Sequence, residues 1–139
     1  MNRFGLTFHH LGLAVKTPDA AVALLAGLGY DAGDAIFDPL QNVFLLMCTH
    51  PTMPSIEIIY PAKGPGPLDK LLVRHKDGLV YHLCYTTQNL DKSLEALGSE
   101  NGMRVICVSP PKAAVLFGGK EVSFYVVADV GLIEIIDDG

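Results

Sequence analysis

The sequence predicts an α+β protein in which two βαβββ modules form a cup-shaped mixed sheet. The first observation is an internal repeat: the segment that begins at His10 matches the segment that begins at His82, with a constant offset of 72 residues (82 − 10). The second is the tetrapeptide Ile-Glu-Ile-Ile, which occurs at 56–59 and again at 133–136. Each copy starts as an apolar strand and continues with apolar residues at helical spacing, so each copy begins as a βα unit.

The helix of the first copy is predicted from its start signal and its apolar stripe. Thr17 can cap the helix, and Pro18 suits the first helical position because its missing N–H is not needed there. Val22, Leu25 and Leu28 are spaced three apart, so one side of the helix is expected to be buried.

The helix of the second copy shows comparable chemistry. Asn89 and Asp91 stand where the start of the helix is expected, and Leu94 and Leu97 repeat the apolar spacing. The two helices are therefore expected to be equivalent elements of the two modules.

Short apolar runs between turn residues predict the remaining strands. These runs lie at 35–37, 42–48 and 55–60 in the first half and at 104–108, 113–117, 120–127 and 132–136 in the second half. We expect one domain over residues 1–139, with module one at about 5–61, a connector at about 62–77 that carries a short helix near 68–75, and module two at about 78–138.

Composition and charge exclude several classes of function. The formal net charge is −5, and the ten lysines and arginines are scattered, so a nucleic-acid partner is not expected. No apolar run approaches the roughly 20 residues of a membrane helix, and the first residues lack a signal-peptide core. We therefore expect a cytoplasmic protein with no membrane partner.

Cysteine usage indicates no disulfide framework. Cys48, Cys84 and Cys107 are an odd number without a Cys-x-x-Cys pair, and all three lie among apolar residues. We expect three reduced, buried thiols.

Strand periodicity places four potential metal ligands on one face. His10 shares its side of the first strand with Gly12 and Ala14, whereas the larger residues face the helix. The same alternation applies to His82, and in both Ile-Glu-Ile-Ile strands the isoleucines beside the glutamate point away from it. His10, Glu57, His82 and Glu134 are thus expected on the face opposite the helices.

A divalent cation explains why this face carries two glutamates. An ionised carboxylate in an apolar strand loses several kcal/mol on leaving water unless something compensates its charge. One +2 ion balances two carboxylates, and imidazole and carboxylate ligands suit Zn²⁺, Ni²⁺, Co²⁺ or Mn²⁺. The alternatives are histidines satisfied by core hydrogen bonds and glutamates paired with lysine or arginine.

Motifs spread over nearly the whole chain resemble those of one known family. They are His-His-Leu-Gly-Leu-Ala-Val at 9–15, Ser-Ile-Glu-Ile-Ile-Tyr-Pro at 55–61, Tyr-His-Leu-Cys at 81–84 after the helix at 68–75, Gly-Gly at 118–119 before Lys-Glu-Val, and Gly-Leu-Ile-Glu at 131–134. They resemble the vicinal oxygen chelate superfamily, with the glyoxalase/bleomycin resistance/dioxygenase fold, and within it methylmalonyl-CoA epimerase and glyoxalase I.

The resemblance implies a metal-dependent isomerase or epimerase, or a lyase of the glyoxalase family. It maps the ligands of one divalent metal onto His10, Glu57, His82 and Glu134. We take Glu134 as the catalytic proton carrier, because a carboxylate can leave the ion and accept a proton when the substrate chelates the metal. The resemblance also implies a small-molecule substrate such as a CoA or glutathione thioester or hemithioacetal, and a homodimer.

The chain departs from the epimerase pattern at one place. Epimerases carry a proton-transfer glutamate on the third strand of the first module, whereas 40–45 contains no acid here. Asp38 and Gln41 are the candidates for this second group. The missing acid keeps open a non-catalytic small-molecule-binding protein of the same fold. An extradiol-type oxygenase is disfavoured because Glu57 would occupy a position that dioxygen needs.

Overall fold

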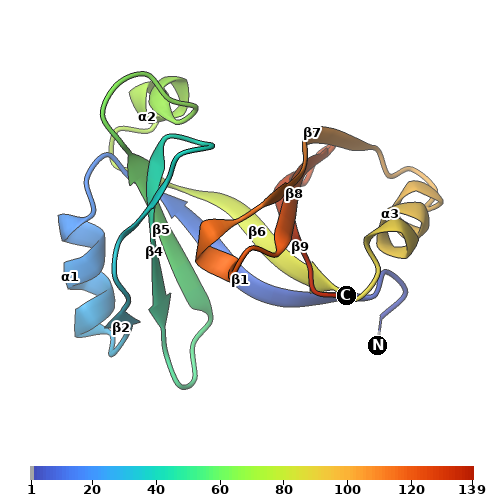
Figure 1. The fold of residues 1–139 in the computed structure, drawn as a ribbon, viewed down its shortest axis with the longest axis horizontal. Helices are drawn as coiled ribbons and strands as arrows, with labels where there is room; N and C mark the ends of the chain where they lie inside the picture. The colour runs from blue at the N-terminus through green and yellow to red at the C-terminus, as the bar shows by residue number, and fades with distance from the viewer. Residues whose placement is uncertain (1) are drawn as a thin grey trace. The chain divides into compact units, whose positions relative to one another are not determined.

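The computed structural model describes residues 2–139, and these form two compact units (Figure 1). The central unit is His10–Tyr81; the terminal unit combines the segment up to His9 with His82–Gly139. Strands β1 (Leu6–Ala14) and β6 (Leu79–Thr87) each contribute residues to both units. The boundaries that the sequence suggested for one domain and its modules stay a prediction.

The central unit is built around a mixed sheet. Its elements besides the shared strands are α1 (Asp19–Gly27), β2 (Asp31–Ala32), β3 (Ile36–Asp38), β4 (Val43–Thr49), β5 (Ser55–Pro61) and α2 (Asp69–Arg74). The strand order is β2-β4-β5-β1, with β3 also on β4, and β1 runs parallel to β5 while β4 is antiparallel to it. Ala21 and Leu25 of α1 pack with Leu46 and Ile58 in one core, which holds the helix beside β4 and β5 (Figure 1).

The terminal unit repeats this topology. It contains α3 (Leu90–Gly98), β7 (Val105–Ala113), a 3₁₀ turn (Val115–Phe117), β8 (Glu121–Val127) and β9 (Gly131–Asp137), in the strand order β6-β9-β8-β7. Its first strand is again parallel to its last, and β8 is antiparallel to β9. The predicted α+β class with two βαβββ repeats is confirmed.

One predicted strand is wrong. The segment at 113–117 is not a separate strand, because β7 continues to Ala113 and the chain then closes a 3₁₀ turn. The Ala114 carbonyl accepts hydrogen bonds from the N–H groups of Phe117 and Gly119, at 3.3 and 3.0 Å. Gly118 and Gly119 have φ of 64° and 84°, a region that glycine enters without strain, so this pair permits the turn.

One of the two helices starts differently from the expectation. Pro18, not Thr17, occupies the position before α1, and no side chain caps that helix. Asn89 caps α3 as expected, because its side-chain oxygen accepts the Lys92 N–H at 3.0 Å.

The expectation of three buried thiols is wrong for one of them. Cys48 and Cys84 are buried, and burial raises the pKa of the Cys48 thiol. Cys107 is exposed because it lies on β7, an edge strand that pairs only with β8 and whose side chains are mostly exposed to solvent.

Among residues 2–139, none of the helices has the length and apolar character that crossing a bilayer requires.

Candidate metal centre

The central unit holds one buried histidine–glutamate pair. His10 on β1 has 0% of its surface exposed, and Glu57 on β5 has 2%. The register pairs Gly12 with Glu57, and His10 lies two residues before Gly12, so both ligand candidates face the same side of the sheet. His10 Nε2 lies 3.7 Å from Glu57 Oε2.

The other face of β5 explains why this glutamate is held in place. Ile56 and Ile58 pack into the core that contains α1, which fixes the strand with Glu57 pointing away from the helix. Gly12 has no side chain to fill the space beside the carboxylate, and Met47 on β4 stands opposite it in the register. The alternation predicted from the sequence is therefore present.

The terminal unit holds the equivalent pair. His82 on β6 is 3% exposed and Glu134 on β9 is 4% exposed. His82 Nε2 lies 3.0 Å from Glu134 Oε1, and the His82 ring meets Phe124 edge to face at 5.5 Å between centroids. Because Cys84 pairs with Glu134 and lies two residues after His82, the histidine and glutamate again share a face.

The registers show that the two pairs are structural equivalents. Gly12 opposes Glu57 in one unit and Cys84 opposes Glu134 in the other, and Cys84 stands 72 residues after Gly12 (84 − 12). The offset between the glutamates is 77 (134 − 57), so the additional five residues fall between the first and last strands of the second module.

The donor atoms fit a divalent ion. Metal bonds of about 2.0–2.2 Å to nitrogen and oxygen put two donors of one ion about 3.0–3.5 Å apart. The separations of 3.0 Å in the terminal unit and 3.7 Å in the central unit match this range or slightly exceed it. Imidazole with carboxylate is a donor combination that Zn²⁺, Ni²⁺, Co²⁺ and Mn²⁺ accept.

Asp38 also lies on the Glu57 face of the central unit. It is 5% exposed, and it pairs with Val43 of β4, whose side of the sheet Met47 and Glu57 share. Its carboxylate accepts the Leu40 N–H at 2.9 Å and the Gln41 side-chain amide at 3.1 Å. A buried carboxylate is therefore present next to residues 40–45, which contain no acid, and the Gln41 side chain donates a hydrogen bond to it.

Sequence reasoning missed two neighbours of the glutamates. Met47 stands opposite Glu57, and Phe124, which is 9% exposed, stands opposite Glu134. Alternation along β4 and β8 places these residues on the same face of the sheet as the glutamates. Only the strand register shows which residue lies opposite which glutamate.

A family model decides to which group the chain belongs. The model of the Glyoxalase/Bleomycin resistance protein/Dioxygenase superfamily matches residues 9–124. The chain belongs to this superfamily. The predicted vicinal oxygen chelate membership is thus confirmed. No curated protein matches the sequence.

Several solved structures share the fold of this chain. Methylmalonyl-CoA epimerase from Mycobacterium tuberculosis has a TM-score of 0.74 at 20% identity, covering 97% of this chain and 88% of that one. A hypothetical protein from Bacillus halodurans C-125 has a TM-score of 0.77 at 19% identity, covering 96% and 95%. A variant of Streptomyces coelicolor methylmalonyl-CoA epimerase in complex with 2-nitronate-propionyl-CoA has a TM-score of 0.71 at 20% identity, covering 96% and 99%.

Proposed function

We propose that the protein is a divalent-metal-dependent isomerase or epimerase in which His10, Glu57, His82 and Glu134 hold one ion. The observation that carries this proposal is the pair of buried histidine–glutamate contacts at equivalent positions of the two units. A histidine–glutamate pair that only stabilises the fold has no reason to recur at the equivalent position of the second unit. The two pairs together supply two nitrogen and two oxygen donors.

Charge balance supports a shared ion. The two glutamates contribute −2 and the neutral imidazoles contribute nothing, so one divalent cation makes the ligand set neutral. Four protein ligands leave positions for water or a chelating substrate on an ion that accepts five or six ligands. Zn²⁺, Ni²⁺, Co²⁺ and Mn²⁺ are the candidates.

The proposed chemistry is proton transfer next to a carbonyl. A bound divalent ion would act as a Lewis acid, polarising that carbonyl and stabilising the negative charge that develops when the neighbouring carbon loses its proton. Glu134 is the proposed carrier: its carboxylate accepts this proton and returns it. Glu57 is proposed to remain a ligand.

Inversion of a stereocentre requires a second proton carrier on the opposite side of the planar carbon. Asp38 is our candidate, because it is buried on the Glu57 face and Gln41 donates a hydrogen bond to it. A carboxylate held by one amide and one backbone N–H keeps a defined orientation, which proton delivery to one face requires.

The substrate class is proposed to be a small molecule with two oxygens that chelate one ion, such as a CoA thioester of a malonyl-type acid. Two structural neighbours are methylmalonyl-CoA epimerases in complex with 2-nitronate-propionyl-CoA and with methylmalonyl-CoA. A glutathione hemithioacetal is the second chemistry to test. A cytoplasmic location and a homodimer belong to the same proposal.

Metal stoichiometry tests the shared site. Elemental analysis of the purified protein is expected to find one divalent ion per chain, and both His10→Ala and His82→Ala are expected to lose it. Full retention of metal by either variant, or two ions per chain, would contradict the four-residue site. Added Zn²⁺ is expected to raise the melting temperature of metal-stripped wild type, because an ion that binds only the folded chain stabilises it.

Turnover tests the activity separately. The holoenzyme is assayed with methylmalonyl-CoA and with the glutathione hemithioacetal of methylglyoxal, with and without EDTA, and exchange of solvent deuterium into each compound is followed. Exchange that EDTA abolishes supports the isomerase. Tight binding of either compound without any exchange would instead identify the alternative, a small-molecule-binding protein of this fold.

A further inference from the structure

The face of the central sheet on which α1 packs also carries a row of three aromatic rings. Phe37 pairs with Phe44, and Phe44 pairs with Tyr60, so the side chains lie side by side across β3, β4 and β5. The rings of Phe44 and Tyr60 stack with 5.3 Å between centroids and 17° between planes, and those of Phe37 and Phe44 meet at 5.4 Å. These three residues, the aromatic row, form one continuous surface.

The aromatic row extends beyond the part of this face that α1 covers. Leu46 lies two residues after Phe44 on β4, so the two share a face, and Leu46 packs with α1 in the core. Tyr60 packs against the same core, whereas Phe37 at the other end of the row is 45% exposed. The row therefore runs from the core of the central unit out to solvent.

The fold does not require aromatic residues in this row. Phe44 and Tyr60 lie three residues along their strands from the register position of Glu57. Counting three residues in the same way from the register position of Glu134 gives the equivalent row of the terminal unit, which is Ala113, Glu121 and Asp137. None of these residues is aromatic, and two are acidic. A reason other than folding of a βαβββ module is therefore needed for the aromatic row.

A groove lies at the exposed end of the aromatic row. It has a volume of about 530 Å³ and is lined by Phe37, Asn42, Phe44, Ala62 and Lys63. Small-molecule sites ordinarily have volumes of about 300–1,000 Å³ and aromatic walls with a few polar groups. The groove has both properties, and its walls suit a flat aromatic ring, because such rings pair with the faces and edges of phenylalanine.

The Asn42 side chain gives the groove a hydrogen-bond acceptor. Its Nδ2 group donates to the carbonyls of Lys63 and Pro65, at 3.0 Å in each case. Because both N–H groups of the amide are used in this way, the group that Asn42 can offer to a ligand is its Oδ1 oxygen. The ring that suits this groove therefore carries an N–H or amino donor.

Lys63 gives the groove a positive charge. It is exposed, and the residues that line the groove include no acid. Asp38, the acid next to Phe37, faces the other side of the sheet, because neighbouring residues of a strand alternate. Asp69 of α2 is followed at once by Lys70, so this pair adds no net negative charge. The groove thus complements an anionic group.

We propose that this groove is a second ligand site of the central unit and that it binds a flat heteroaromatic ring with an amino donor and an anionic substituent, as in an adenine nucleotide. The ring stacks on Phe37, the amino group donates to Asn42 Oδ1, and the phosphate lies at Lys63. The site is on the face of the sheet opposite Glu57, so it does not depend on the proposed metal chemistry.

AMP binding tests the ring contact. Isothermal titration of the full chain with AMP is expected to show one site per chain. Phe37→Ala removes the exposed ring and is expected to raise the dissociation constant at least about tenfold, because stacking on an aromatic side chain contributes this much for a base. Leu40→Ala is the matched control, since Leu40 is 63% exposed but does not line the groove, and it is expected to leave AMP binding unchanged. Circular dichroism verifies that the variants fold.

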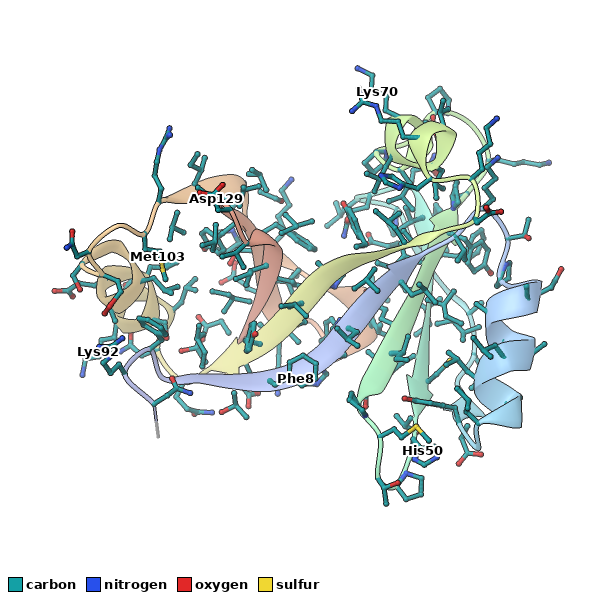
Figure 2. All side chains as sticks on the ribbon, turned by 180° about the vertical axis from the view of Figure 1, so that it is seen from behind. Phe8, His50, Lys70, Lys92, Met103 and Asp129 are labelled. Carbon is teal, nitrogen blue, oxygen red and sulfur yellow. The ribbon has the colours of Figure 1, made fainter. Side chains whose placement is uncertain are left out.

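A comparison of AMP with adenosine tests the charge. Lys63→Gln is expected to weaken AMP binding by about two- to fivefold and to leave adenosine binding unchanged, because adenosine has no phosphate. A lysine that only supported the structure would weaken both. Lys70→Gln is the control, because Lys70 lies on the outer side of α2 (Figure 2) and does not line the groove.

Coenzyme A distinguishes two sources of the nucleotide, a free nucleotide and the nucleotide end of a CoA thioester. If Phe37→Ala weakens coenzyme A and AMP by the same factor, the site holds the nucleotide end of a CoA thioester. If it weakens AMP alone, the site holds a free nucleotide.

Two results would overturn the proposal. One is a wild type that binds no AMP at millimolar concentration, and the other is AMP binding that neither Phe37→Ala nor Lys63→Gln changes. Metal-stripped protein is expected to bind AMP as well as metal-loaded protein does. Failure of this site is therefore distinguishable from failure of the proposed metal centre, which metal stoichiometry measures.

Discussion

The central and terminal units carry the same ligand candidates at the same register but surround them differently. In the central unit, Gly12 and Met47 flank Glu57, and the histidine lies 3.7 Å from the glutamate. In the terminal unit, Cys84 and Phe124 flank Glu134, and the corresponding distance is 3.0 Å. The two units thus share their donor atoms but differ in the residues around them. Because their surroundings differ, the two glutamates can take different roles.

The largest expected effect separates these roles. Glu134→Gln is expected to lower the rate of solvent deuterium exchange into substrate by about 10²–10⁴-fold, because the proton carrier is lost. Glu57→Gln is expected to lower metal affinity by at least about 10–100-fold, the loss that results when only the hydrogen-bond partner of a ligand is changed, while exchange persists at saturating metal. Isothermal titration with metal and mass spectrometry of the substrate measure the two effects. Equal losses of exchange in both variants at saturating metal would show that the units are functionally symmetric.

Asp38 extends the comparison, because the terminal unit supplies the first proposed carrier and the central unit the second. Asp38→Asn is expected to retain exchange from one stereoisomer of the substrate and to slow inversion by about 10²-fold or more. Chiral analysis of the product against the deuterium content separates exchange from inversion. If inversion and exchange decline together, Asp38 acts on the structure and not on the proton.

The neighbours of the glutamates are expected to differ in their tolerance of substitution. Gly12→Val adds a side chain beside the buried Glu57 carboxylate and is expected to lower the free energy of unfolding by about 1–3 kcal/mol. Cys84→Ala removes one sulfur atom at the equivalent position and is expected to cost about 1 kcal/mol. Urea denaturation monitored by circular dichroism measures both. A larger loss for Cys84→Ala would mean that the terminal unit is the more tightly packed of the two.

The smallest expected effect compares the helix starts. Asn89→Ala removes the side chain that caps α3 and is expected to lower the free energy of unfolding by about 1 kcal/mol. Thr17→Ala is expected to change it by less than about 0.5 kcal/mol, because no side chain caps α1. The same urea titrations serve here, and a cost of Thr17→Ala equal to that of Asn89→Ala would contradict the absence of a cap.

The repeat made the fold and the ligand faces predictable. The spacing of His10 and His82 and the two Ile-Glu-Ile-Ile strands determine which side chains share a face, since alternation along a strand has a fixed period. The turn at 115–117 was not predictable in this way, because its apolar residues match a strand pattern and only the following glycines permit the closure. The partners of the glutamates depend on strand register, which is set by contacts between segments far apart in the chain.

The discontinuous terminal unit has a consequence for folding. Its first strand residues precede the whole central unit, and the contacts that attach them join distant parts of the chain: Ser93 donates a hydrogen bond to the Phe4 carbonyl at 2.7 Å, and the rings of Phe8 and Tyr85 meet at 5.8 Å. Closing so long a loop costs more entropy than forming local contacts, so these contacts are expected to form more slowly. During synthesis, the whole central unit therefore leaves the ribosome before the strands of the terminal unit with which the amino-terminal segment packs.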